Sequence, residues 1–129
     1  MPKVNITAIA FTLSALIVSI LACCSRESDP ELKRLDREAT LSMSTYAKEN
    51  LDSIGQQLLS HACKEGNRTY EGKAHFYLSS FRSGISDKER KQRLSHLDTA
   101  EKIADETNND TLRSMIYNQR GVWELADSY

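Results

Sequence analysis

The chain has 129 residues, a length that suits one domain, and its 17 lysine and arginine residues nearly balance its 18 aspartate and glutamate residues. Without a basic excess the composition argues against nucleic-acid binding, and without an acidic block it argues against a disordered acidic tail. The only two prolines are Pro2 and Pro30, so the sequence after Pro30 lacks the strongest helix breaker. The composition therefore favours an all-helical protein.

The N-terminus has the layout of an export signal. Lys3 gives a short positive segment, and residues 4–22 contain no ionisable side chain. This stretch approaches the length of about 20 apolar residues that a membrane span needs. Its serine and threonine residues favour a cleaved signal, with an uncleaved anchor and a plain secretory signal as the alternatives.

The tetrapeptide Ile20-Leu21-Ala22-Cys23 resembles the lipobox of bacterial lipoproteins. The resemblance implies cleavage after Ala22 and attachment of lipid to Cys23, and two or more acyl chains would hold the protein firmly at a membrane. The sequence as a whole predicts a signal peptide over residues 1–22, a tether over 23–29 and a helical domain over 30–129. The expected location is the extracytoplasmic side of a bacterial cell envelope, with a lipid anchor in the membrane.

Two helices are predicted before the Gly66-Asn67 break. Asp29-Pro30 has the pattern of an N-cap followed by proline at the first helical position. Apolar residues then recur every three or four positions, which is the period of a half-buried helix. The expected core residues are Leu32, Leu35, Ala39, Met43 and Tyr46 in the first helix, and Leu51, Ile54, Leu58, Leu59 and Ala62 in the second.

Three further helices are predicted after that break. The third is expected to end near Gly84, a capping-box pattern from Ser86 to Glu89 opens the fourth, and residues 108–110 separate the fourth from the fifth. The expected core residues are Tyr70, Ala74, Tyr77, Leu78 and Phe81, then Leu94, Leu97, Ala100, Ile103 and Ala104, then Leu112, Met115, Ile116, Gln119, Trp123 and Ala126. Short connections imply that successive helices pack antiparallel.

A helix-pair period of about 40 residues favours a solenoid, with a simple up-and-down bundle as the alternative. Leu78-Ser79, and Tyr117 followed by Gly121, resemble the Leu-Gly and aromatic-to-Gly spacings of tetratricopeptide repeats. That family uses a small residue there so that the paired helix can approach closely. Residues 97–125 also resemble the divergent repeats of large Bacteroidetes envelope sensors and regulators. The spacing of 42 residues from Ser79 to Gly121 departs from the family period of about 34.

Motifs for chemistry are missing from the sequence. It contains no zinc-protease, nucleophile-elbow or glycine-rich phosphate motif. His61 and Cys63 are two apart, so they do not face the same way on a helix, and no second ligand pair follows. We therefore expect no catalytic residue, no metal ion and no cofactor. A basic cluster, for which we expect either an exposed face or contact with an acidic partner or lipid headgroups, comprises Lys88, Arg90, Lys91 and Arg93.

These observations favour a membrane-anchored lipoprotein with a non-catalytic, tetratricopeptide-like protein-interaction domain. The alternative is a truncated extracytoplasmic input region of a repeat-containing sensor. The expected partners are a protein or peptide, or a second copy bound through the broadly apolar fifth helix. The residues expected to form the interaction surface are His75, Arg82, Asn118, Gln119, Val122 and Trp123.

Lipid attachment at Cys23 gives the first prediction. Mass spectrometry of protein extracted from membranes is expected to show a mature chain that begins at Cys23 and carries acyl mass. Cys23→Ala removes the thiol that accepts lipid, so it should release the protein or leave an unprocessed precursor. Cys24→Ala is the matched control and should change little. A mature protein that still begins with Met1 would contradict the prediction.

Overall fold

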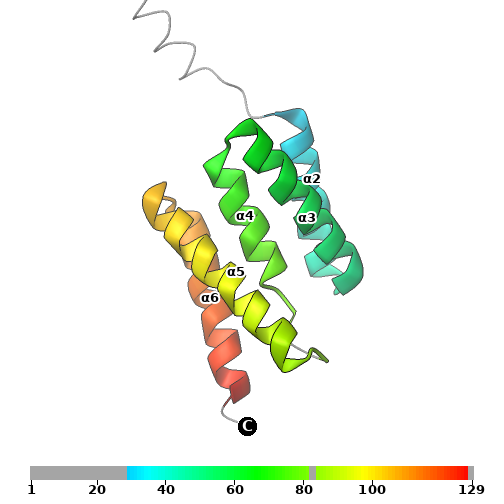
Figure 1. Cartoon of the computed structure of the whole chain (residues 1–129), viewed down its shortest axis with the longest axis vertical. Helices are drawn as coiled ribbons and strands as arrows, with labels where there is room; N and C mark the ends of the chain where they lie inside the picture. The colour runs from blue at the N-terminus through cyan, green and yellow to red at the C-terminus, as the bar shows by residue number, and fades with distance from the viewer. Residues whose placement is uncertain (1–28, 82–83, 128–129) are drawn as a thin grey trace, which may run out of the picture.

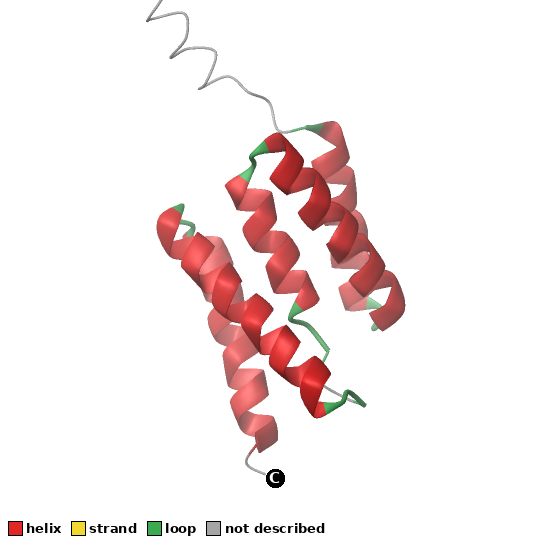
Figure 2. Ribbon diagram, in the orientation of Figure 1, coloured by secondary structure: helices red, strands yellow, loops and turns green. Residues whose placement is uncertain are grey.

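The structure, a computed structural model, describes residues 29–81 and 84–127. Within these ranges it contains helices and no strands, which confirms the all-helical prediction (Figure 2). The helices are α2 (Pro30–Ser44), α3 (Lys48–Glu65), α4 (Arg68–Leu78), α5 (Asp87–Glu106) and α6 (Asp110–Asp127). None of them is long and apolar enough to cross a membrane. The predicted signal, lipobox and lipid-bearing cysteine lie outside the described residues.

The helices form an open array of antiparallel pairs. Figure 1 shows α2, α4 and α6 running in one direction and α3 and α5 running back between them. Each helix packs on the next, α2 also contacts α4, and α4 also contacts α6. The first and last of these helices, α2 and α6, do not contact each other, whereas in a closed bundle they would. The predicted helix-pair arrangement is therefore confirmed.

The same chain reversal joins α3 to α4 and α5 to α6. Gly66 and Asn108 both adopt left-handed backbone conformations, with φ of 64° and 51°. The following residues, Asn67 and Asn109, accept hydrogen bonds on their side chains from amides three residues later, at 3.2 and 3.0 Å. Glycine and asparagine are the residues that tolerate the left-handed region best, and asparagine is a strong N-cap. The reversal thus repeats at an interval of 42 residues.

The core lies between two layers of helices, one formed by α2, α4 and α6 and the other by α3 and α5 (Figure 1). Most predicted core positions are buried, namely Leu32, Leu35, Ala39, Leu51, Ile54, Leu58, Ala62, Ala74, Tyr77, Leu78, Leu97, Ala100, Ile103, Ala104, Leu112, Ile116 and Trp123. Two predictions are wrong. Tyr46 follows the end of α2 and is 82% exposed, so it is not a core residue. α4 ends at Leu78 and not near Gly84, so Phe81 lies beyond the helix, although it is partly buried against the core as expected. Phe76, which the periodicity left out, is buried.

Close approach of helices occurs at small residues. Ser79, directly after α4, is fully buried. A Cβ on Gly72 would lie 2.7 Å from a methyl group of Leu112, and one on Gly55 would lie 2.9 Å from a methyl group of Leu78. At Gly121, by contrast, a Cβ would have no described atom within 4 Å, so the expected close approach is not made there.

Arg93 caps the C-terminal end of α4. Its guanidinium, 5% exposed, donates to the carbonyl oxygens of Leu78 and Ser80 at 3.0 and 2.6 Å. It also forms ion pairs with Asp52 on α3 at 2.7 Å and with Glu89 at 3.0 Å. Burial acts to lower the pKa of Arg93, but these two carboxylates outweigh it and raise the pKa. The interpretation of Arg93 as part of an exposed basic cluster is therefore wrong.

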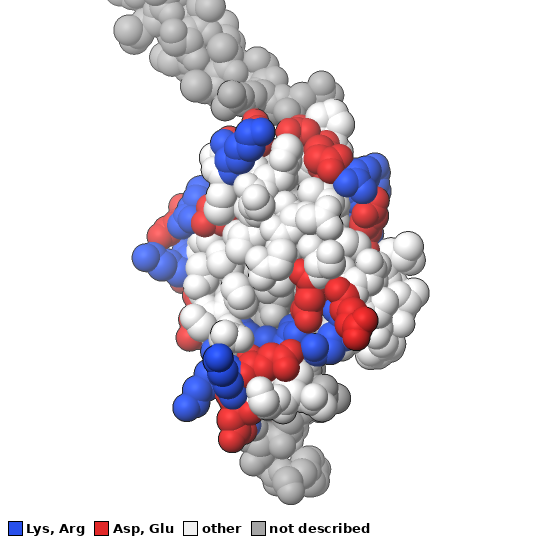
Figure 3. Space-filling model, turned by 45° about the vertical axis from the view of Figure 1, so that its right-hand side comes forward, with Lys and Arg blue, Asp and Glu red and all other residues white. Residues whose placement is uncertain are grey.

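The rest of the surface carries both signs of charge. On the face that Figure 3 shows, lysine and arginine side chains are interspersed with aspartate and glutamate side chains around a broad uncharged area. This mixture agrees with the nearly neutral composition of the chain.

Replacing Arg93 by methionine is expected to destabilise the fold. The change keeps most of the side-chain volume but leaves two carbonyl oxygens and the carboxylate of Asp52 without their donor. We expect the free energy of unfolding to fall by about 2–4 kcal/mol, measured by urea denaturation. Lys91→Met, at an exposed position of the same helix, is the control and should change it by less than about 0.5 kcal/mol. Equal effects of the two changes would contradict the role given to Arg93.

Candidate functional site

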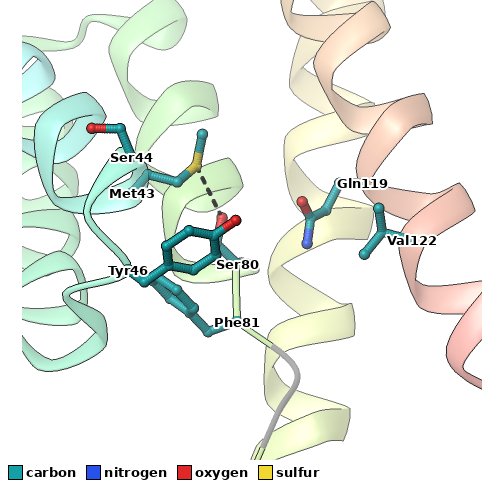
Figure 4. Close-up of a pocket in the computed structure, with 7 residues that line it drawn as sticks. All are labelled: Met43, Ser44, Tyr46, Ser80, Phe81, Gln119 and Val122. Carbon is teal, nitrogen blue, oxygen red and sulfur yellow. Dashed lines mark hydrogen bonds between the residues drawn. The ribbon is translucent and has the colours of Figure 1, made fainter.

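An open groove of about 540 Å³ lies between the C-terminal ends of α2 and α4 and the middle of α6. Figure 4 shows its two walls, with residues of α2 and of the segments that follow α2 and α4 facing two residues of α6 across the gap. The described residues that line it are Met43, Ser44, Tyr46, Ser80, Phe81, Gln119 and Val122. The groove thus opens on the layer formed by α2, α4 and α6.

Two aromatic side chains form one rim of this groove. The rings of Tyr46 and Phe81 meet edge to face, with centroids 6.2 Å apart and planes at 61°. Both residues have positive φ, 55° for Tyr46 and 60° for Phe81. A bulky residue rarely adopts this left-handed conformation, which costs about 1–2 kcal/mol. Backbone outliers of this kind cluster at functional sites.

The floor of the groove is soft and mostly apolar. The hydroxyl of Ser80 donates to the sulfur of Met43 at 3.6 Å, a weak hydrogen bond that joins α2 to the end of α4. Methionine has three rotatable bonds and a polarisable sulfur, so it adapts to differently shaped apolar groups. On the other wall Gln119 is half-buried and Val122 is 43% exposed. These groups can bury an apolar side chain and offer one amide for a hydrogen bond.

The structure brings together two of the six predicted surface residues. Gln119 and Val122 line the groove, whereas Asn118 is exposed outside it. Trp123 is 4% exposed and packs in the core, with the guanidinium of Arg90 5.8 Å from its ring centroid. Its assignment to an interaction surface is therefore wrong. Arg82 lies outside the described residues.

The residues of the wall that Tyr46 and Phe81 form are not among the predicted surface residues. Met43, Tyr46 and Phe81 were assigned to helix stripes because their spacing continues the helical period. The sequence offers one signal for this wall. The apolar stripe of α2 continues to Tyr46, and no capping residue or glycine lies between Tyr46 and the following helix. Only the positive φ at Tyr46 turns its side chain outward.

The sixth predicted residue, His75, belongs to a separate cluster. Its Nδ1 lies 2.8 Å from Nδ1 of His96 on α5, and the two ring centroids are 5.1 Å apart. When both rings are neutral, one Nδ1–H donates to the other Nδ1. Burial lowers the pKa of both imidazoles. The charge of His96 and of Arg68 lowers the pKa of His75 further against the opposing effect of Glu71.

Charged neighbours also act on His96 from two other helix positions. After burial, the charge of Arg93 lowers its pKa, and the charge of Asp52 opposes this shift. The pair therefore favours the neutral state in the folded protein. Neither histidine is among the described residues that line the groove.

No family model, curated protein or solved structure matches the chain. The function of the groove is therefore argued from its own residues.

The histidine pair predicts acid sensitivity below about pH 6.5. Because the folded-state pKa values of His75 and His96 lie below the ordinary value of about 6.5, the unfolded chain takes up more protons as the pH falls. The contribution of the pair to stability is complete above about pH 6.5 and is lost as the pH drops toward the lowered folded-state values. Urea denaturation at several pH values above 5, where carboxylates stay ionised, measures this loss.

The double variant His75→Gln/His96→Gln is the control for this prediction. Glutamine can keep a hydrogen bond between α4 and α5 but does not titrate. Its free energy of unfolding should vary less with pH than that of the wild-type protein. The same slope in both proteins would show that other groups cause the acid sensitivity.

Proposed function

We propose that the chain is an envelope lipoprotein whose helical domain is a non-catalytic interaction module, and that its groove binds an uncharged, apolar segment of a partner protein. The observation that carries the proposal is the groove bounded by Tyr46, Phe81 and Val122 on the α2–α4–α6 layer. Arrays of helix pairs bind extended peptides or helices on such a layer. The open helix-pair arrangement supports a tetratricopeptide-like domain in this role.

The lining residues define the chemistry of the partner. Charged residues make up 27% of the chain, but none of the described groove residues is charged. A charged side chain buried there would lose its hydration without gaining an ion pair, which is unfavourable. An apolar side chain would instead remove Tyr46 and Val122 from water. The groove therefore discriminates against charged segments and favours apolar ones.

Strain at Tyr46 and Phe81 supports a binding role. Neither left-handed residue is a glycine, although glycine would adopt the same backbone without steric cost. Their rigid aromatic rings are suited to anchor a partner, because such rings bury a large area at a small cost in conformational entropy. The strain thus has a use in presenting the rings at the rim.

The direction of the groove supports access by a partner. The chain enters the domain at the N-terminal end of α2, whereas the groove lies at the C-terminal end (Figure 1). The 15 residues of α2 separate these ends by about 22 Å. If lipid at Cys23 holds the first end near a membrane, the groove lies at the end of α2 away from that anchor.

Self-association through α6 would compete with partner binding, because both would use the wall of the groove that α6 forms. Tyr117, Val122 and Leu125 are exposed on α6, while Trp123 is buried and has no part in it. A second copy bound through these residues would cover the wall of the groove that Val122 forms. Sedimentation of the full chain distinguishes this dimer from a monomer with an accessible groove.

The proposal predicts that Tyr46→Gly weakens peptide binding without destabilising the fold. The probe is a phage library of short random peptides, selected on the full chain in lipid nanodiscs after depletion on empty nanodiscs. Selected peptides should be apolar and uncharged, and Tyr46→Gly should weaken them about tenfold because an aromatic anchor is lost. The melting temperature should stay within a few degrees, since glycine relieves the strain at this φ.

Two further variants sharpen the experiment. Val122→Lys places a charge on the opposite wall and should abolish binding. Leu41→Ala removes an exposed apolar side chain of α2 that does not line the groove, so it should leave binding unchanged. A library without enrichment, or peptides that bind Val122→Lys as well as the wild-type protein, would refute the groove. A dimer disrupted by Val122→Lys would assign this surface to a second copy.

A further inference from the structure

Three potential metal ligands converge where the chain enters the domain. Asp29, His61 and Glu65 each bring one ligand atom to a site in which all three atoms lie within 4.8 Å of one another. Nε2 of His61 and Oδ2 of Asp29 are 2.8 Å apart. Both side chains are about 70% buried, at 27% and 31% exposure, whereas Glu65 is exposed.

The local fold explains this convergence. His61 and Glu65 lie four residues apart near the end of α3, so they share one face of the helix. Asp29 is the N-cap of α2, which runs antiparallel to α3, so its carboxylate reaches the same end of the pair. Oδ1 of Asp29 accepts from the amide of Glu31 at 2.8 Å, and this bond orients Oδ2 toward His61.

We propose that Asp29, His61 and Glu65 bind a divalent transition-metal ion of the zinc class. Imidazole nitrogen combined with carboxylate oxygen suits zinc and its neighbours, whereas magnesium and calcium prefer oxygen alone. Metal–ligand bonds of about 2.0–2.2 Å place the ligand atoms of a tetrahedral site about 3.3 Å apart. His61 and Asp29 need to separate slightly, and the exposed side chain of Glu65 rotates inward. Water completes the coordination.

The surrounding charges are compatible with a cation. The amide of Glu31, and then His61, lower the pKa of Asp29, so this ligand is ionised at neutral pH. Glu31 is engaged by Arg34, whose Nε lies 2.8 Å from its carboxylate, and does not compete for the ion. Lys64 adds one positive charge nearby, against the two negative charges of Asp29 and Glu65.

This site differs from the pair of potential ligands His61 and Cys63 that the sequence contains. Cys63 is exposed and is not a member of the cluster. The third ligand comes instead from Asp29, 32 residues before His61. Bound metal would fasten the N-terminus of α2 to the C-terminus of α3, which are the two ends nearest the predicted tether.

The test is zinc titration of the full chain in detergent, with Cys23, Cys24 and Cys63 replaced by serine so that thiols cannot bind the metal. Calorimetry should show one zinc ion per chain, and zinc should raise the melting temperature by several degrees relative to a chelator. Cobalt(II) should give the visible absorption of a four-coordinate ion. Asp29→Asn, which keeps an N-cap acceptor, His61→Gln and Glu65→Gln should each weaken zinc binding at least tenfold.

His75→Gln is the matched control, since it removes a different half-buried histidine. It should leave the zinc affinity unchanged. Circular dichroism confirms that each variant is folded, and Asp29→Asn and Glu65→Gln are conservative enough to separate loss of a ligand from loss of structure. Zinc affinity that survives all three ligand changes, or that falls equally in His75→Gln, would overturn the proposal.

Discussion

A buried arginine organises the junction on which the rest of this domain depends. Arg93 extends from α5 toward the beginning of α3 and the end of α4. There it donates hydrogen bonds to two carbonyl oxygens and two carboxylates. A buried charge is unfavourable unless it is paired, and the two terminal nitrogens of Arg93 are paired, whereas its Nε has no hydrogen-bond partner among the described residues. The three segments must hold their positions together to keep these pairs. Lys48 extends the network, because it pairs with Glu89 at 2.9 Å. This constraint joins the first helix pair to the second.

The groove follows from the same constraint. Arg93 binds the carbonyl of Leu78, the last residue of α4, and that of Ser80 beyond the helix, and the chain continues to Phe81 on the side of α2. Tyr46 turns outward at the end of α2 and meets Phe81 there. Both aromatic residues hold unfavourable backbone conformations that a locally determined loop would relax. The surrounding network can sustain this strain at Phe81 because it holds the preceding residue, Ser80, in place.

The sequence predicts what depends on local pattern, and it misses what depends on distant neighbours. The core stripes and the caps at Asp29 and Ser86 follow from helical period and capping chemistry, so they could be predicted directly. Arg93 looked like part of a solvated basic run, because nothing nearby in sequence shows that Asp52 lies opposite it, 41 residues away. Tyr46 continues a helical period by chance. The groove, which requires α2, α4 and α6 at once, therefore had no sequence signature beyond Gln119 and Val122.

The two proposed sites divide the domain in a way that its architecture explains. In an array of antiparallel helix pairs, N-caps of α2, α4 and α6 gather at one end and their C-terminal ends at the other (Figure 1). The first end collects polar capping groups, and there Asp29 meets the final turns of α3. The second end collects the residues that follow each helix, and there apolar side chains are left without a covering helix. A metal ion would stiffen the end nearest the tether without occupying the groove. Anchoring and recognition can therefore act on the same pair of helices independently.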